Sequence, residues 1–145
     1  MVNIIIFQWH PELETGIELI DQQHKQIVQN CNTFFIRYKC RQGAAAIQDC
    51  LDFLQQYIQY HFQTEEAFQV ECRYPGYRLH QALHKDLATR VKFFSVQLAD
   101  TGYAEEVADG FYSFLIQWLQ KHLMEEDRKF AACYRGYLEK ERAAQ

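Results

Sequence analysis

The chain has 145 residues, of which 48% are hydrophobic and 15% aromatic, and its formal net charge at pH 7 is −4. This length and composition predict a single globular domain over residues 1–145 and exclude a disordered chain. The acidic balance, with Lys and Arg scattered along the sequence, argues against a nucleic-acid-binding protein.

The first twenty residues show no targeting signal. The opening MVNIIIFQWH has a short apolar run without a basic flank or a small-residue cleavage site. No apolar run in the chain approaches the roughly 20 residues that span a bilayer. We therefore expect a cytoplasmic protein without a membrane segment, with residues 1–20 as an extended N-terminal arm.

Four amphipathic segments follow the arm, separated by Gly43, by Pro75–Gly76 and by Gly102. In each segment apolar residues recur with a period of about 3.6, and no segment alternates with period two for long. Short connections favour antiparallel neighbours, so the sequence predicts an all-α fold, an up-down-up-down four-helix bundle over residues 21–134. Residues 135–145 are expected to form a short polar helical end.

Five of the six histidines lie within the apolar stripes of these helices. They are His24, His61, His80, His84 and His122. Glu65 and one carboxylate of HLMEED lie on or near the same faces. A buried polar group without a partner costs on the order of 1–3 kcal/mol, and a domain with ~5–15 kcal/mol of net stability cannot carry seven of them. A metal would satisfy all of these groups together, so the pattern predicts a metal centre.

The donor set narrows the choice of metal. Zinc usually closes at four ligands, often with thiolate, and calcium and magnesium prefer oxygen donors. Imidazoles combined with carboxylates suit iron or manganese, and seven side chains are too many for one ion. Two ions bridged by carboxylates fit this set.

Several motifs resemble those of a known family. H-x-x-x-E at 61–65, H-x-x-x-H at 80–84 and H-x-x-x-x-D at 122–127, preceded by GIELIDQQHK with His24, resemble the hemerythrin signature. HFQTEEAF, YPGYRLHQALH and WLQKHLMEED resemble the bacterial branch, the bacteriohemerythrins. The resemblance covers about Trp9 to Tyr134 and implies a non-haem di-iron bundle that binds dioxygen reversibly.

The resemblance also implies a role for each of the seven side chains. His80, His84 and His122 would hold one iron, His24 and His61 the other, and Glu65 and Asp127 would bridge them together with an oxo or hydroxo group from solvent. One position then remains open on the iron with two histidines, and dioxygen would bind there.

The choice of Asp127 rests on the resemblance alone. On an ideal helix Glu126 lies about 40° from His122 and Asp127 about 140°, so periodicity by itself favours Glu126. Asp127 can reach the site only if the helix ends or is distorted there.

A dry apolar wall is expected around the open position, because water would favour the release of peroxide and leave ferric iron. The candidates beside the predicted ligands are Ile27 or Val28, Phe62, Trp118, Leu119 and Leu123. Tyr57 and Tyr77 share helix faces with His61 and His80 and are candidates as hydrogen-bond donors to them, with packing as the alternative.

Other functions remain open at this point. A ferritin-like di-iron oxidase would use E-x-x-H pairs, and the sequence has none; only D21-Q-Q-H24 comes close. A sensor of oxygen, nitric oxide or redox state would be indicated by a fused output domain, and an iron-scavenging protein is a third alternative. We expect an oxygen-binding protein rather than an enzyme, with dioxygen as its partner, for transport, storage or delivery.

The five cysteines, Cys31, Cys40, Cys50, Cys72 and Cys133, indicate no separate site. Their odd number and the lack of a C-x-x-C motif favour neither a disulfide framework nor a thiolate zinc site. Most are interpreted as small buried hydrophobic residues, with redox sensing as the alternative.

Overall fold

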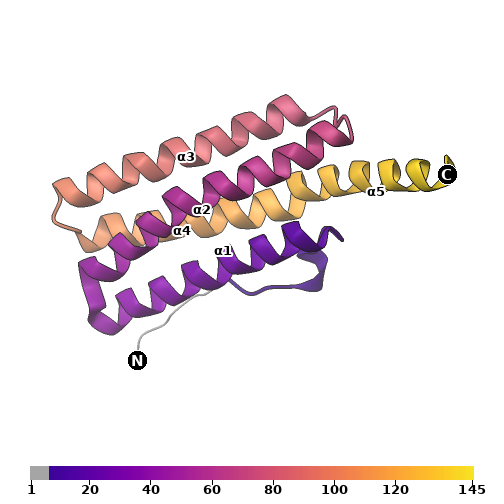
Figure 1. Cartoon of the computed structure of the whole chain (residues 1–145). Coiled ribbons are helices and arrows are strands. Elements are labelled where there is room, and N and C mark those ends of the chain that lie inside the picture. Colours follow the sequence, from indigo (N-terminus) through magenta and orange to yellow (C-terminus); the bar gives the residue numbers. More distant parts are fainter. Residues whose placement is uncertain (1–6) are drawn as a thin grey trace.

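Four helical rods lie side by side with alternating direction in the computed structural model, which describes residues 7–145 (Figure 1). The first three rods are α1 (Glu18–Arg37), α2 (Gly43–Glu71) and α3 (Tyr77–Asp100). The fourth rod consists of α4 (Glu105–Lys121), the π-helix η3 (His122–Glu126) and α5 (Asp127–Ala143). This confirms the predicted all-α antiparallel four-helix bundle.

The rods change direction at the predicted breaks. A π-helical turn, η2 (Tyr38–Gln42), joins α1 to α2 and is followed by Gly43 at φ 54°. Gly102, between α3 and α4, has φ 64°. Glycine adopts this left-handed region without the steric penalty that a side chain would bring, so both turns depend on it.

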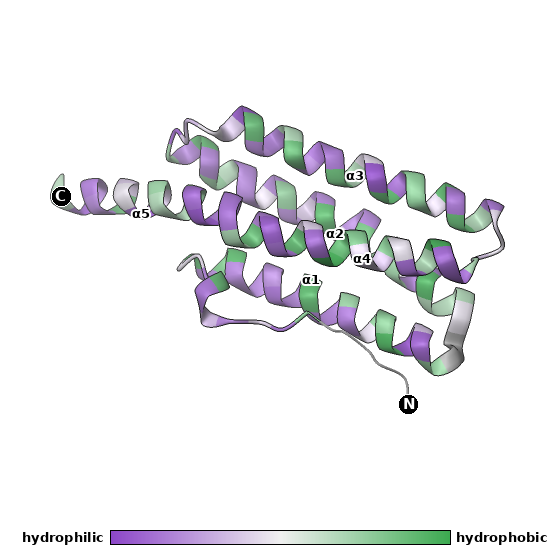
Figure 2. Cartoon of the chain, turned by 180° about the vertical axis from the view of Figure 1, so that it is seen from behind, coloured by the Kyte–Doolittle hydropathy of each residue, from purple (hydrophilic) through white to green (hydrophobic). Residues whose placement is uncertain are grey.

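The core has two parts that both contact the buried histidines. The larger cluster runs between the rods and includes Leu54, Leu87 and Leu115. A smaller cluster lies where the end of α2 meets α5, and its buried members are Ile17, Ile20, Cys72, Phe130 and Tyr134. Hydrophilic and hydrophobic residues are interspersed along every rod, as expected when each helix has a polar face and an apolar face (Figure 2).

The described part of the arm lies against the bundle. The Phe7 N–H donates to Asn32 Oδ1 at 3.0 Å, and Asn32 Nδ2 donates to the Phe7 carbonyl at 2.7 Å. A short 3₁₀ turn, η1 (Pro11–Leu13), buries Leu13. Residues 1–6, which belong to the same expected arm, lie outside the described residues.

Helix α1 begins inside the expected arm, at Glu18. The backbone N–H groups of Thr15 and Gly16 donate to the carboxylate of Asp21 at 2.7 and 3.1 Å, which holds the chain just ahead of the first helical turn. At the other end, the expected polar segment 135–145 is a direct continuation of α5 as far as Ala143. Within residues 7–145, no helix combines the length and the apolar character needed to cross a membrane.

Candidate metal centre

All seven predicted ligands lie in the interior of the bundle, and every rod contributes at least one. None is more than 5% exposed: His24 from α1, His61 and Glu65 from α2, His80 and His84 from α3, and His122 and Asp127 from the fourth rod. The sequence-based set is therefore brought together without exception.

The fourth rod is distorted where the sequence required it. The Asp127 backbone N–H donates to the carbonyl of His122, five residues earlier, so η3 is one residue wider than an α-helical turn. This places Asp127 Oδ1 at 3.2 Å from His122 Nε2. Glu126, which a regular helix would favour, instead lies at 3.6 Å from Lys129 Nζ, so the periodicity argument for Glu126 is wrong.

The five imidazoles fall into two groups. In the first, His80 Nε2 and His84 Nε2 lie at 3.0 and 3.1 Å from His122 Nε2. In the second, His24 Nε2 lies at 3.0 Å from His61 Nε2. Each histidine therefore turns its Nε2 atom toward the other members of its group.

Glu65 lies between the two groups. Its Oε1 is 2.6 Å from His80 Nε2 and 3.4 Å from His84 Nε2. Its Oε2 is 3.3 Å from His24 Nε2 and 3.2 Å from His61 Nε2. One carboxylate oxygen thus faces each group.

Asp127 repeats this arrangement from the fourth rod. Its Oδ1 is 3.0 Å from His80 Nε2 and 3.2 Å from His122 Nε2, whereas its Oδ2 is 3.2 Å from His24 Nε2. Both carboxylates therefore turn one oxygen toward each histidine group.

The donor atoms fit bound metal better than they fit one another. The four oxygens of Glu65 and Asp127 are buried and have no well-aligned hydrogen bond, despite the nearby imidazoles. Unsatisfied buried carboxylates are costly, and a bound cation would remove that cost. Within the described residues the atoms fall into one five-residue group (Glu65, His80, His84, His122 and Asp127) and one three-residue group (His24, His61 and Glu65) that could each hold an ion.

The charges in the cluster favour ionised carboxylates. Burial alone would raise the pKa of Glu65, but its contacts with four histidines hold that pKa well below the ordinary value. The pKa of Asp127 is also lowered, since His122 and His80 outweigh burial and the charge of Glu65. Burial opposes the charged form of His80, yet the two carboxylates raise its pKa to about 10. A cation would therefore have to displace a proton from His80.

Two side chains orient the imidazoles of His61 and His84 through hydrogen bonds with Nδ1, the ring nitrogen that faces away from the cluster. His61 Nδ1 donates to Gln23 Oε1 at 2.8 Å, and His84 Nδ1 donates to Glu66 Oε2 at 3.3 Å. A proton on Nδ1 leaves the lone pair on Nε2, which is the atom that faces the cluster. Sequence reasoning missed Gln23 as a partner, because only the tertiary structure shows that this α1 side chain meets α2.

The two tyrosines considered as donors to His61 and His80 have other partners. The Tyr57 hydroxyl donates to Gln26 Oε1 at 2.9 Å, and the Tyr77 hydroxyl accepts a hydrogen bond from Gln81 Nε2 at 3.3 Å. Gln23 occupies the position behind the imidazole of His61, and His80 Nδ1 has no hydrogen-bond partner among the described residues. The hydrogen-bonding hypothesis for Tyr57 and Tyr77 is therefore not supported.

A small cavity borders the cluster on one side. It measures about 20 Å³, taken as the space open to the centre of a water-sized molecule, and this is room for about one such molecule. The predicted apolar residues Ile27, Phe62, Trp118, Leu119 and Leu123 all line it, together with His24, His61 and His122. The rings of Phe62 and Trp118 also stack on His84 and His122, with centroids 3.7 and 4.3 Å apart.

Comparison with known proteins gives a consistent result. The sequence model described as "Hemerythrin HHE cation binding domain" matches residues 15–134. The chain is 31% identical to a bacteriohemerythrin of Pseudomonas aeruginosa, over 88% of the chain and 80% of the relative. It is 26% identical to a bacteriohemerythrin of Clostridium acetobutylicum, over 86% of the chain and 98% of the relative. It is 28% identical to a hemerythrin of Siphonosoma cumanense, over 86% and 90%. The matched range contains all seven clustered side chains, and the chain belongs to the hemerythrin family.

Proposed function

We propose that this protein binds dioxygen reversibly at a non-haem di-iron centre and serves oxygen transport, storage or delivery. The observation that carries the proposal is the apolar cavity, which is lined by His122 and by both members of the group of two histidines, His24 and His61. That group offers fewer protein donors than the other, and a site with fewer protein ligands keeps a position for an exogenous ligand.

In this proposal His80, His84 and His122 hold one iron and His24 and His61 hold the other. Glu65 and Asp127 bridge the pair, which is supported by the way each carboxylate turns one oxygen to each group. The two irons, joined also by an oxo or hydroxo bridge from solvent, would supply the two electrons that dioxygen takes up and returns.

The chain's own residues would make the binding reversible. Ile27, Leu119 and Leu123 present hydrocarbon to the cavity, and exclusion of water suppresses the proton transfers that accompany loss of peroxide. Gln23 and Glu66 hold the tautomer of His61 and His84, so the ring nitrogens that face the irons keep their lone pairs.

The composition of the cluster favours oxygen carriage over a ferritin-like oxidase. Oxidase centres of that class take most of their ligands from glutamates, whereas this cluster has five imidazoles and two carboxylates. The relatives named hemerythrin and bacteriohemerythrin lend further support.

The proposal is tested by an oxygenation cycle. The metal-free protein is loaded with ferrous iron under anaerobic conditions, dioxygen is admitted and then removed, and the visible absorbance is followed throughout. We expect a band that appears with dioxygen and disappears when it is removed, over repeated cycles. A band that persists after removal, as a single irreversible oxidation would give, contradicts the proposal.

A further inference from the structure

Two cysteines meet where the end of α2 contacts α5, apart from the metal cluster. Cys72 directly follows the last residue of α2, and Cys133 lies in α5. Their Sγ atoms are 3.8 Å apart, and both are free thiols. Cys72 is buried against Ile20 and Phe130, whereas Cys133 is half-exposed, so solvent reaches the pair from one side.

We propose that Cys72 and Cys133 are a redox modification site, at which a peroxide converts the two thiols into a reversible disulfide. The two sulfurs of a disulfide are about 2.05 Å apart, so the distance between the Sγ atoms must shorten by less than about 2 Å. Cys72 lies at the helix end, ahead of a turn in which Arg73 has φ 56°. The closing movement can therefore be shared between the two side chains and the turn that follows α2.

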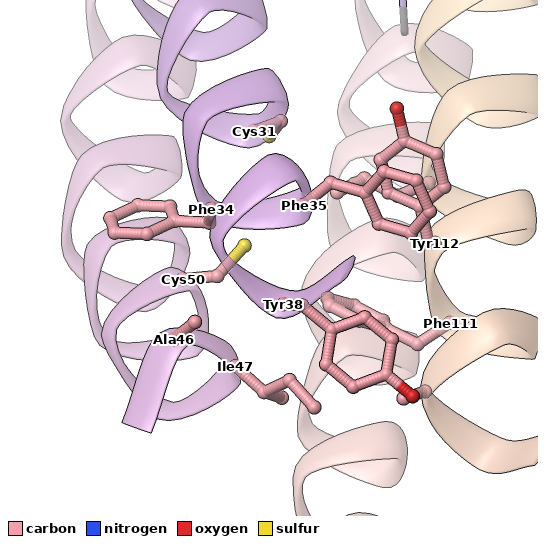
Figure 3. Close-up of a pocket in the computed structure, with 11 residues that line it drawn as sticks. Cys31, Phe34, Phe35, Tyr38, Ala46, Ile47, Cys50, Phe111 and Tyr112 are labelled. Atoms are coloured by element: carbon pink, nitrogen blue, oxygen red, sulfur yellow. The ribbon is translucent and has the colours of Figure 1, made fainter. Parts of the chain in front are cut away.

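The other cysteines provide an internal comparison. Cys31 and Cys50 also form a pair, and the thiol contact with Cys50, together with burial, raises the pKa of Cys31 well above its ordinary value. Both are only 3% and 6% exposed and lie beside the aromatic residues of an apolar cavity (Figure 3). Cys40 is exposed, but it lies on the turn between α1 and α2, at the opposite end of the bundle (Figure 1). Cys72 and Cys133 therefore combine a contact between two thiols with access of solvent to one of them.

The reaction balances with one peroxide. Burial and the contact with Cys133 raise the pKa of Cys72 to about 11, so Cys72 remains a thiol at neutral pH. The Cys133 thiolate attacks one oxygen of hydrogen peroxide, the O–O bond breaks, and a sulfenic acid and hydroxide form. The Cys72 sulfur then displaces hydroxide from the Cys133 sulfur. The two protons end in water, so two thiols and one peroxide give one disulfide and two waters.

The new bond would join the segments that carry the two clustered carboxylates. Glu65 lies on α2 and Asp127 at the start of α5. The closed loop runs from Cys72 to Cys133 and contains His80, His84 and His122. A cross-link over a loop of this length restricts the unfolded chain, and we expect the melting temperature to rise by about 5 °C or more.

Peptide mapping of the full-length, metal-loaded protein tests the site. The metal is first brought to its oxidised state, so that it does not consume the oxidant, and the protein is then treated with one equivalent of hydrogen peroxide. Remaining thiols are blocked, and the tryptic peptides are analysed without reduction. The peptide of residues 130–135 carries Cys133, and that of residues 42–73 carries both Cys50 and Cys72. A Cys50→Ser variant removes this ambiguity. Cys40→Ser is the control for an exposed thiol, and Cys133→Ser removes the reactive partner.

We expect the two peptides to be joined, and dithiothreitol to separate them. The link and the gain in melting temperature should persist in Cys40→Ser and be lost in Cys133→Ser. The proposal is overturned if Cys133 is oxidised to sulfinic acid with no link, or if Cys72 and Cys133 both remain thiols. Neither readout requires that the metal centre bind dioxygen, so this test is independent of the proposed function.

Discussion

The position of Asp127 is the residue-scale feature on which the proposed pair of cations depends. Asp127→Ala removes the oxygens that face both histidine groups, and we expect the protein to lose at least half of its metal. Glu126→Ala is the matched control, because the carboxylate of Glu126 is paired with Lys129 outside the cluster. Metal content is measured after gel filtration. Loss of metal from Glu126→Ala with retention in Asp127→Ala would reverse the assignment.

His80 should make the stability of the metal-free protein depend on pH. Its pKa is raised from 6.5 to about 10, so its contribution to stability is fully present below pH 6.5 and is lost as the pH rises through 10. Glu65 and Asp127 have pKa values lowered from 4.5 and 3.8, respectively. Their contributions to stability are therefore present above pH 4.5 and pH 3.8 and are lost on acidification. We expect the melting temperature to fall by several degrees between pH 7 and pH 10.

The His80→Asn variant is the control for this pH dependence. It keeps a polar side chain but cannot be protonated, so the alkaline decline should be weaker in this variant. Equal alkaline declines in the parent and in His80→Asn would show that another group is responsible.

The apolar cavity leads to a prediction about oxidation. Leu119→Asn places an amide in the wall of the cavity, and we expect the oxygenated protein to autoxidise to the ferric state several-fold faster while it keeps its iron. Leu79→Asn, at a position that is 63% exposed on α3, is the control and should autoxidise at the parental rate. The decay of the oxygenated absorbance gives both rates. An unchanged rate in an iron-loaded Leu119→Asn protein would mean that the cavity wall does not protect the bound oxygen.

At the scale of elements, the positions of glycine and proline predicted the turns of the bundle well. Gly43, Pro75–Gly76 and Gly102 all lie at turns, because glycine and proline act locally and are legible without tertiary information. Hydrophobic periodicity did not predict the π-helices η2 and η3, since it continues through them with one extra residue. A distortion at η3 was expected only from the family resemblance that selected Asp127. The same limitation made Glu126 the better candidate by periodicity.

The candidate site was predictable to different degrees for the same reason. The clustered histidines could be found because several imidazoles within apolar stripes have no other economical explanation. Gln23 and Glu66 could not be recognised as orienting partners, because glutamine and glutamate are ordinary on solvent-facing positions of helices. Only the packing of α1 and α3 against α2 shows what they contact.

Helix α5 buries one face of its first half and is exposed at its end, which allows a truncation test. Residues 139–145 are exposed, and their deletion should change the free energy of unfolding by no more than about 0.5 kcal/mol. Deletion from Tyr134 onward removes a buried ring of the smaller core cluster and should cost about 3–5 kcal/mol. Urea denaturation measures both. Equal effects of the two deletions would show that the end of α5 packs in a way that its exposure does not indicate.

At the scale of the whole molecule, the fold and the metal cluster depend on each other. The larger core cluster contacts the histidines from one side, through Phe62 stacked on His84. The smaller one contacts them from the other, where the ring of His80 lies 6.4 Å from that of Phe130. The bundle therefore positions the donor atoms from two sides, and a bound metal would in turn stabilise the fold by the free energy of binding.

Two irons that act as one dioxygen site would bind iron and dioxygen in a fixed ratio, and both can be measured on one sample. Ferrous iron is titrated into the metal-free protein without oxygen, and the dioxygen taken up and then released under vacuum is measured on the same sample. We predict two irons per chain and one dioxygen per two irons, recovered in full as dioxygen. One iron per chain, or dioxygen that is consumed rather than released, would rule out a reversible site shared by two irons.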